Sequence, residues 1–313
     1  MALLREVDPG EVGRADRVKP LSRRPPKAIL FHGDGRSEPV AIPGCTARLA
    51  EPRTFFFADL HVPNESELEV LQKEFQFHPL AIEDVRTRHQ RPKIDIYGDR
   101  YFLVFYRVGP GPGPNGDWLL QEIDFFIGPN FLIVTHDSEV PLLDAVFDRF
   151  LRSTGRKGVA TLLYEILDAI VDQYFEFLDD FGERSDALEE RIFEGSYDRA
   201  NLKELHELKT ELALLRRVVS PGRDAVNVLL RRDPPILDQA DIFYFQDVYD
   251  HLIRVSDSID TYRELATVTI DAFLSVQNNQ LAEVVKKLTV ISIIFLPLNF
   301  ITGFWGMNFA WTS

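Results

Sequence analysis

The stretch that decides the fold is residues 288–307, LTVISIIFLPLNFITGFWGM, near the end of a chain of 313 residues. From Leu288 to Ser313 no residue carries a charge. About 20 apolar residues are enough for a helix to cross the hydrocarbon core of a bilayer, so this run predicts a transmembrane helix. A buried core helix is the alternative, which Pro297 and Asn299 in mid-run favour, but the run is long for a helix of a soluble protein.

Two charges in front of the run predict its orientation. Lys286 and Lys287 directly precede the apolar stretch. Positively charged flanks stay on the cytoplasmic side of a membrane, so the large N-terminal part is expected in the cytoplasm and Asn308 on the far side. The sequence therefore predicts a protein of the cell (inner) membrane, with the lipid bilayer as a partner.

The composition excludes several classes of protein. With 49 acidic and 35 basic residues, the net charge is −14, which argues against a nucleic-acid binder and suits cationic ligands. The one cysteine, Cys45, excludes a disulfide framework and a CxxC zinc or redox site. A Gly-rich phosphate loop, GxSxG and HExxH are all missing from the sequence, so an enzyme is the least favoured class.

The N-terminal half predicts a tail followed by a domain of mixed secondary structure. Residues 1–27 are basic and Pro-rich and are expected to form a loose, flexible tail. Residues 28–140 alternate strand and helix signals, which favours an α/β domain with a mixed sheet. Within it, Asn64 is expected to cap a helix over residues 65–75, because its side chain can accept an orphan backbone N–H.

Residues 141–287 predict a helical domain. Long helices are expected over 159–194 and 201–232, the second with Asn201 as its cap and with Pro221 as a point where it kinks or ends early. From Asp238 the chain has no proline or glycine before the apolar run. A helix that continues to Trp305 would be about 100 Å long. A helix of that length needs partners, which predicts a bundle or an oligomer.

The acidic residues concentrate in the helical domain. Residues 161–260 contain 23 Asp and Glu but 11 Lys and Arg. Acids recur at every fourth position of the first long helix and so share one face: Asp168, Asp172, Glu176 and Asp180. Adjacent like charges on a helix are unfavourable. The pattern fits either a solvated helix face or a surface that collects divalent cations.

Several motifs in one order point to a known family. The apolar run ends in Gly306-Met307-Asn308, within FLPLNFITGFWGMNF at 295–309. Further motifs are HPLAIEDV at 78–85, HQRPKID at 89–95 and YFQDVYDH at 244–251. From about residue 50 to 309 the chain resembles the CorA family of magnesium channels, whose signature is Tyr-Gly-Met-Asn after the first transmembrane helix. Trp305 stands here in place of the usual Tyr.

The resemblance implies an architecture. The chain would be an α+β membrane protein that assembles into a funnel-shaped homopentamer. An αβα cytoplasmic domain with a mixed sheet would form the wide end, the long helix from Asp238 the stalk, and residues 288–307 the first transmembrane helix that lines the pore. Residues 308–313 would begin the outer loop, which a second transmembrane helix follows in the family. The chain stops at Ser313 before such a helix, so we expect a fragment or a truncated product that does not conduct as written.

The resemblance also implies a selectivity filter formed by Gly306, Met307 and Asn308. Mg²⁺ sheds its water reluctantly, and neutral oxygens can hold the hydrated ion through that water. Asn308, repeated five times around an axis, would supply such a ring. The alternative role of Asn308 is a simple C-terminal helix cap.

Below the filter, five residues at spacings of four, four, three and four form one seam of the helix: Leu288, Ser292, Leu296, Asn299 and Gly303. This seam is expected to line the pore. Asn299 is its one amide, and such a polar group serves either ion passage or hydrogen bonding between helices. Leu288 and Leu296 would make apolar constrictions.

A gate is implied by the same resemblance. Asp84 and Asp247 would face each other between neighbouring subunits, and Glu83 and Asp168 would form a second, weaker site. Mg²⁺ would hold the closed assembly together there, so the ion would regulate its own influx. For each acid alone, an exposed or ion-paired carboxylate is the alternative.

The function expected from the sequence is influx of Mg²⁺, and by resemblance Co²⁺, as hydrated cations down the electrochemical gradient. One alternative is the zinc-transporting branch of the same superfamily, although zinc prefers His and Cys ligands and Cys45 is remote from the span. A second alternative is a single-pass, membrane-anchored protein that senses metal or binds another protein.

Overall fold

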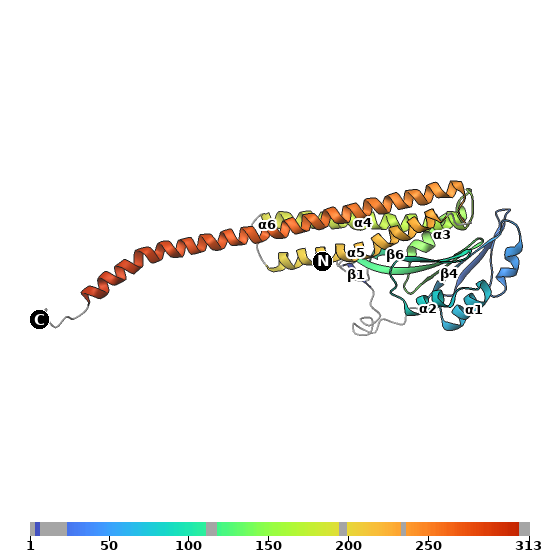
Figure 1. The fold of residues 1–313 in the computed structure, drawn as a ribbon, viewed down its shortest axis with the longest axis horizontal. Helices are drawn as coiled ribbons and strands as arrows, with labels where there is room; N and C mark the ends of the chain where they lie inside the picture. Colours follow the sequence, from blue (N-terminus) through green and yellow to red (C-terminus); the bar gives the residue numbers. More distant parts are fainter. Residues whose placement is uncertain (1–3, 7–23, 111–117, 194–198, 233–235, 307–313) are drawn as a thin grey trace.

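The computed structural model describes residues 4–6, 24–110, 118–193, 199–232 and 236–306. An α/β domain lies at one end of the molecule, and a single long helix runs from it to the opposite end (Figure 1). The filter residues Met307 and Asn308 and the expected outer loop at 308–313 lie outside the described residues.

The sheet is mixed, as the sequence predicts. Its order is β3-β2-β4-β8-β7-β6-β5, with β1 beside β7. The pairs β4–β8 and β1–β7 are parallel and the other pairs are antiparallel. The strands are β1 (Leu4–Glu6), β2 (Lys27–Phe31), β3 (Ser37–Pro39), β4 (Phe55–His61), β5 (Lys93–Tyr97), β6 (Arg100–Pro110), β7 (Trp118–Gly128) and β8 (Phe131–His136).

Helices cover both faces of the sheet (Figure 1). They are α1 (Glu65–Phe75), α2 (Pro79–Thr87), α3 (Pro141–Arg152), α4 (Val159–Phe193), α5 (Arg199–Arg231) and α6 (Gln239–Trp305), and a short 3₁₀ helix spans Cys45–Ala50. Successive side chains of β4 point to opposite faces of the sheet. Phe56 stacks on Phe75 of α1, whereas Phe57 stacks on Phe147 of α3. Phenylalanine pairs of this kind carry much of the core between the layers.

Local signals explain the helix starts. Asn64 accepts a hydrogen bond from the backbone N–H of Glu67, whose side chain accepts one from the N–H of Asn64, and this capping box confirms the expected cap of α1. Asp238 and Asp241 form the same reciprocal pair at the start of α6. Each pair satisfies two backbone donors that the first helical turn would leave unpaired.

Three expectations from the sequence are corrected. Leu4–Glu6 forms a strand beside β7, inside the segment expected to be a loose tail, because the start of β7 extends beyond its pairing with β8. Helix α5 begins at Arg199, so Asn201 is a buried helical residue and not the cap. Helix α5 also continues through Pro221. The next residue, Gly222, lies against the ring of Phe105, where an added Cβ would be 2.9 Å from the ring.

Helix α6 changes its surroundings along its length. Its first half packs on α4 and α5 and buries a stripe of side chains from Phe245 to Phe273. From residue 274 to 306 every side chain is at least partly exposed. No residue of the most apolar stretch in this part is buried. A large uncovered apolar surface marks contact with lipid or protein. The helix is thus long and apolar enough to span a membrane, as the sequence predicts.

Candidate divalent-cation site

The candidate site lies where α4 and α6 pack side by side. Asp168 projects from α4, and Asp247 and His251 project from one face of α6, one helical turn apart. One ligand atom from each of the three residues lies within 4.8 Å of the others. The three residues therefore form a preassembled group of metal-ligating atoms.

Distances within the group leave room for an ion. His251 Nδ1 is 4.0 Å from Asp168 Oδ1, and His251 Nε2 is 3.5 Å from Asp247 Oδ1. His251 Nδ1 is buried and has no hydrogen-bond partner among the described residues. Most buried polar atoms find a partner, so an unpaired one beside two carboxylates indicates space for a cation or a water molecule.

The electrostatics of the site favour a bound cation. Burial raises the pKa of Asp168, and the nearby Asp172 and Asp247 carboxylates add to the rise, against the opposing charges of His251 and Arg149. The pKa of Tyr164 is raised to about 12 by burial and then by the charges of Asp168 and Asp247. Negative charge is thus concentrated beyond what the neighbouring side chains neutralise, and a divalent cation would relieve it.

The group is open on one side. The side chain of Asp247 is 55% exposed and that of Asp168 is 26% exposed, whereas His251 is 20% exposed and rests edge-on against Phe175. Two carboxylates and one imidazole cannot complete an octahedron around Mg²⁺. Waters, or carboxylates from a second chain, would supply the remaining ligands.

The other two acids expected at the gate lie elsewhere. Glu83 and Asp84 are on α2, which covers the face of the sheet opposite α4 and α6 (Figure 1). Glu83 is exposed, and Asp84 forms an ion pair with Lys93 at 2.7 Å, which in turn contacts Asp95 at 2.7 Å. Within one chain, the structure thus brings Asp168 and Asp247 together and keeps Asp84 and Glu83 apart from them.

Lys93 is firmly held by its two carboxylates. Burial alone lowers the pKa of Lys93, but its hydrogen bonds to Asp84 and Asp95 outweigh that effect, and the net pKa is raised. A cation at Asp84 therefore has to compete with an ammonium group that is already in place. This internal partner makes Asp84 a weaker ligand than its sequence motif suggests.

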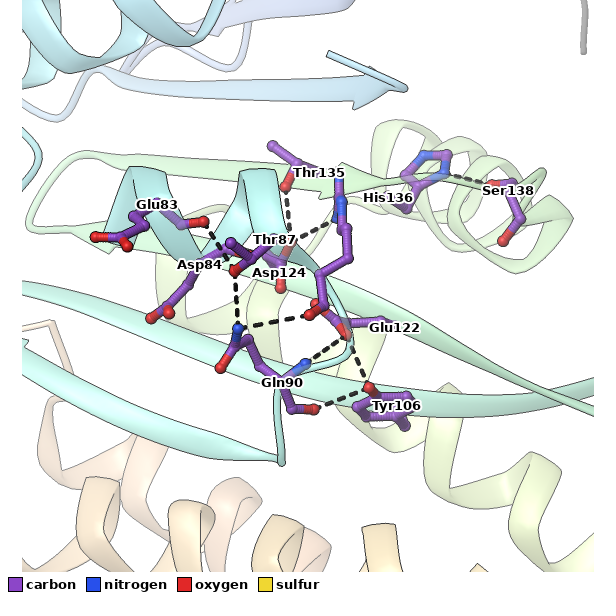
Figure 2. A network of polar contacts seen from close by, with 11 residues as sticks. Glu83, Asp84, Thr87, Gln90, Tyr106, Glu122, Asp124, Thr135, His136 and Ser138 are labelled. Atoms are coloured by element: carbon purple, nitrogen blue, oxygen red, sulfur yellow. Dashed lines mark hydrogen bonds and ion pairs between the residues drawn. The ribbon is translucent and has the colours of Figure 1, made fainter. Parts of the chain in front are cut away.

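A buried polar network fixes the end of α2 (Figure 2). Arg88, just after the helix, donates to the fully buried Asp124 at 2.7 Å, and Thr135 also donates to Asp124. The backbone N–H of Gln90 and the hydroxyl of Tyr106 both donate to Glu122. Burial raises the pKa of Asp124 well above its usual value, although Arg88 opposes the rise. The network ties the helix that carries Glu83 and Asp84 to β7.

The expected pore residues all lie on the uncovered part of α6. Leu288, Ser292, Leu296, Asn299 and Gly303 are exposed. Ser292 donates to the Leu288 carbonyl at 2.9 Å, so its hydroxyl is satisfied within the helix. Gly306 ends the helix, and its N–H bonds to the Thr302 carbonyl at 2.9 Å.

His251 is the site residue that the sequence argument missed. It stands four residues after Asp247 in YFQDVYDH, a spacing that places two ligands on one helix face. That spacing could have identified it. Its closeness to Asp168 could not have been read from the sequence, because the two helices are joined only by packing.

The chain is similar to known proteins over most of its length. A family model described as CorA-like Mg2+ transporter protein matches residues 53–312. The cobalt/magnesium transport protein CorA of Thermotoga maritima is 32% identical over 240 residues, which cover 76% of this chain and 68% of that protein. The putative metal ion transporter YfjQ of Bacillus subtilis is 33% identical over 258 residues, covering 82% and 79%.

More distant proteins share the fold. The complete structure of the CorA magnesium transporter from Methanocaldococcus jannaschii superposes with a TM-score of 0.77 at 23% identity, covering 91% of this chain and 88% of that one. The zinc transport protein ZntB of Photorhabdus laumondii is 24% identical over 281 residues, covering 90% and 84%. The αβα domain and the long helical stalk are therefore an architecture that this chain shares with solved transporters.

The site predicts a Mg²⁺ response that depends on pH. Because the folded-state pKa of Asp168 is raised, the stability linked to its proton is full at low pH and is lost as the pH rises through that pKa. A bound cation restores that stability, so the Mg²⁺-induced rise in melting temperature should be larger at about pH 7.5 than at about pH 5. At ten times Kd we expect about 1.4 kcal/mol, or a few degrees.

Differential scanning fluorimetry of the detergent-solubilised protein measures this response. Asp168→Asn with Asp247→Asn should remove most of it. Glu176→Gln, which removes one exposed charge from the same helix outside the group, should leave it unchanged. A full Mg²⁺ response in the double variant would contradict the assignment.

The network beneath α2 predicts a second result. Arg88→Met strands the buried Asp124 carboxylate without its guanidinium and should cost about 3–5 kcal/mol of unfolding free energy. Adding Asp124→Asn removes the stranded charge and should recover part of the loss. Arg86→Met breaks an exposed pair between α2, which carries Arg86, and Glu65 of α1, and should cost at most about 1 kcal/mol. Urea unfolding measures all three, and a similar small cost for Arg88→Met and Arg86→Met would contradict the role of the network.

Proposed function

This chain belongs to the CorA-like Mg2+ transporter family, and on that premise we propose that it carries hydrated Mg²⁺, and also Co²⁺, into the cell under the control of cytoplasmic Mg²⁺. The family makes the chain a divalent metal transporter. Our proposal adds to this the identity of the ion, the residues of the filter and the residues of the gate. The observation that supports the gate best is the group of Asp168, Asp247 and His251, preassembled and open on one side.

The arrangement of the acids supports a site shared between subunits. Asp84 and Asp247 lie on opposite faces of one sheet, so a pair formed by them needs two copies of the chain. In a homopentamer, Asp84 of one subunit would meet the exposed Asp247 of its neighbour, and Glu83 would meet the partly buried Asp168 in a second, weaker site. Such carboxylates repel one another unless a cation lies between them.

Mg²⁺ would then act as ligand of the closed state. An ion that binds only the assembled, closed arrangement shifts the equilibrium towards it in proportion to its concentration. When cytoplasmic Mg²⁺ falls, the ion leaves, repulsion between carboxylates separates the subunits, and the pore opens. Lys93 sets the threshold, because Asp84 must exchange an ammonium partner for the ion.

The pore would be formed by the uncovered part of α6. Five copies of the seam from Leu288 to Gly303 would face a common axis in the membrane, with the N-terminal domain in the cytoplasm. Leu288 and Leu296 would give narrow apolar rings, and Asn299 a ring of amides between them and the filter. Gly306, Met307 and Asn308 would form the outer filter, where Asn308 holds the ion through its water shell.

Mg²⁺ as regulator and cargo fits the oxygen-rich chemistry better than Zn²⁺. Carboxylates and amides are ligands for hard cations such as Mg²⁺. The specific feature that favours the zinc-transporting branch is His251, since imidazole suits Zn²⁺ and Co²⁺. One relative above 30% identity is named as a cobalt/magnesium transport protein, and this supports Mg²⁺ and Co²⁺ over Zn²⁺.

Loss of the gate acids predicts loss of feedback. In the assembled channel, Asp84→Ala with Asp247→Ala should leave influx active at cytoplasmic Mg²⁺ levels that close the unsubstituted channel. Asp250→Ala, an exposed acid on α6 outside the group, should close normally. Mg²⁺ uptake into proteoliposomes loaded with graded internal Mg²⁺ measures this, and closure of the double variant at the usual level would contradict the gating proposal.

Substitution of Asn308 predicts loss of uptake without loss of fold. Asn308→Leu removes the oxygen that accepts hydrogen bonds from the water shell, so hydrated Mg²⁺ should no longer pass. Asn308→Asp places up to five charges around one axis and should hold the ion too firmly, since charge-assisted contacts are about twice as strong as neutral ones. Uptake in Mg²⁺-starved cells measures both, with oligomer yield as control. Normal uptake by Asn308→Leu would show that Asn308 is only a helix cap.

A further inference from the structure

A cavity lies at the end of two parallel strands, apart from the acidic group on α4 and α6. His61 ends β4 and His136 ends β8, and the register of the parallel pair places them directly opposite each other. Their rings stack with centroids 5.3 Å apart. Asp59, two residues before His61, shares their face of the sheet. The cavity they line has a volume of about 240 Å³.

His61 has a buried ring whose nitrogen atoms form no hydrogen bond with any described residue. Its exposed fraction is 6%, and neither Nδ1 nor Nε2 has a hydrogen-bond partner among the described residues. Burial, with the charge of His136, lowers the pKa of His61, so the ring is neutral at neutral pH. A neutral imidazole offers a lone pair to a metal. A histidine kept for packing alone would be expected to find at least one polar partner.

His136 is oriented as metal-binding histidines commonly are. Its Nδ1 lies 2.5 Å from the Ser138 carbonyl oxygen, which can only accept, so Nδ1 carries the proton (Figure 2). Its Nε2 faces Asp59 Oδ1 at 2.8 Å. A backbone carbonyl that holds one ring nitrogen fixes the tautomer and leaves the other nitrogen for a metal. A cation beside Nε2 would therefore contact the Asp59 carboxylate as well.

We propose that Asp59, His61 and His136 form a binding site for one divalent transition-metal ion of the Co²⁺, Ni²⁺ or Zn²⁺ class, separate from the acidic group on α4 and α6. Two imidazole nitrogens and one carboxylate suit such borderline ions. Mg²⁺ prefers a shell of oxygen atoms and would be excluded. Binding requires the His61 ring to turn from its stacked position towards Asp59, because these ligand atoms are not preassembled as those of the acidic group are.

The mouth of the cavity carries both signs of charge. Glu139 and Asp144 lie there, and Arg24 donates to both, at 3.3 Å and 2.9 Å, while Lys27 is 3.5 Å from Asp144. These ion pairs are largely exposed and therefore weak. Release of Glu139 from Arg24 would provide a fourth ligand and an acidic approach to the imidazoles. Arg24 thus competes with the metal for Glu139. Removal of its charge is therefore expected to strengthen metal binding, whereas removal of a ligand weakens it.

Titration of Co²⁺ into the full chain in detergent, with millimolar Mg²⁺ present throughout, tests the site by the visible spectrum of bound Co²⁺. We expect one bound Co²⁺ per chain that excess Mg²⁺ does not displace. His61→Phe, which keeps a stacked ring, and Asp59→Asn should each weaken binding more than tenfold. Arg24→Gln should tighten it, and Asp168→Asn with Asp247→Asn should not change it.

Two results would overturn the proposal. One is unsubstituted protein that binds no Co²⁺ under excess Mg²⁺. The other is His61→Phe, folded as judged by an unchanged Mg²⁺-dependent melting temperature, that binds Co²⁺ with the original affinity and spectrum. Because no transport is measured, failure of this site leaves the proposed transport function untouched. Should His61→Phe not fold, the Co²⁺ affinities of two other variants decide the matter. The proposal requires weaker binding in Asp59→Asn and tighter binding in Arg24→Gln, and an unchanged affinity in both would overturn it.

Discussion

The structure depends on one helix that cannot cover its own apolar surface. Helix α6 has 67 residues, or about 100 Å, but it buries side chains only up to Phe273. Beyond that point the leucine, isoleucine and phenylalanine side chains among the described residues of the helix are exposed. Water is an unfavourable surrounding for this surface. A bilayer and neighbouring copies of the helix are the surroundings that satisfy it, so the folded chain is built around an element that one chain leaves incomplete.

The acidic group couples this element to the cytoplasmic domain. Asp247 and His251 belong to α6 itself, and Asp168 belongs to the helix packed against it. In the proposed function, a change in how α4 and α6 meet neighbouring chains would be transmitted along one continuous helix to the membrane. Such coupling would need no hinge if the helix moves as a rigid unit. Cation binding at one end and pore geometry at the other would then share a single coupling free energy.

Polar groups in the α/β domain are kept where an apolar core would be more stable. Asp124 and Glu122 are buried beneath α2 with Arg88 and Tyr106, and His61 and His136 are buried at the end of β4 and β8. Burying charges without ideal partners costs free energy. The first set holds the helix that carries Asp84. The second has one ring without a described partner and lies beside carboxylates, an arrangement that packing alone does not require.

Local patterns in the sequence determined the apolar span, the Asn64 cap, the mixed sheet and the unbroken helix from Asp238, because hydrophobic runs and capping residues act over a few neighbouring positions. The family resemblance pointed to Asp168 and Asp247 as acids of interest. Only the tertiary structure decided that these two acids meet within one chain and that His251 lies beside both. It also decided that Lys93 forms an ion pair with Asp84 and that the ring of His61 stacks on that of His136. Apart from the pair of Asp247 and His251 within α6, these contacts join residues of different helices and strands, and their distances follow from how those elements pack, which no local pattern encodes.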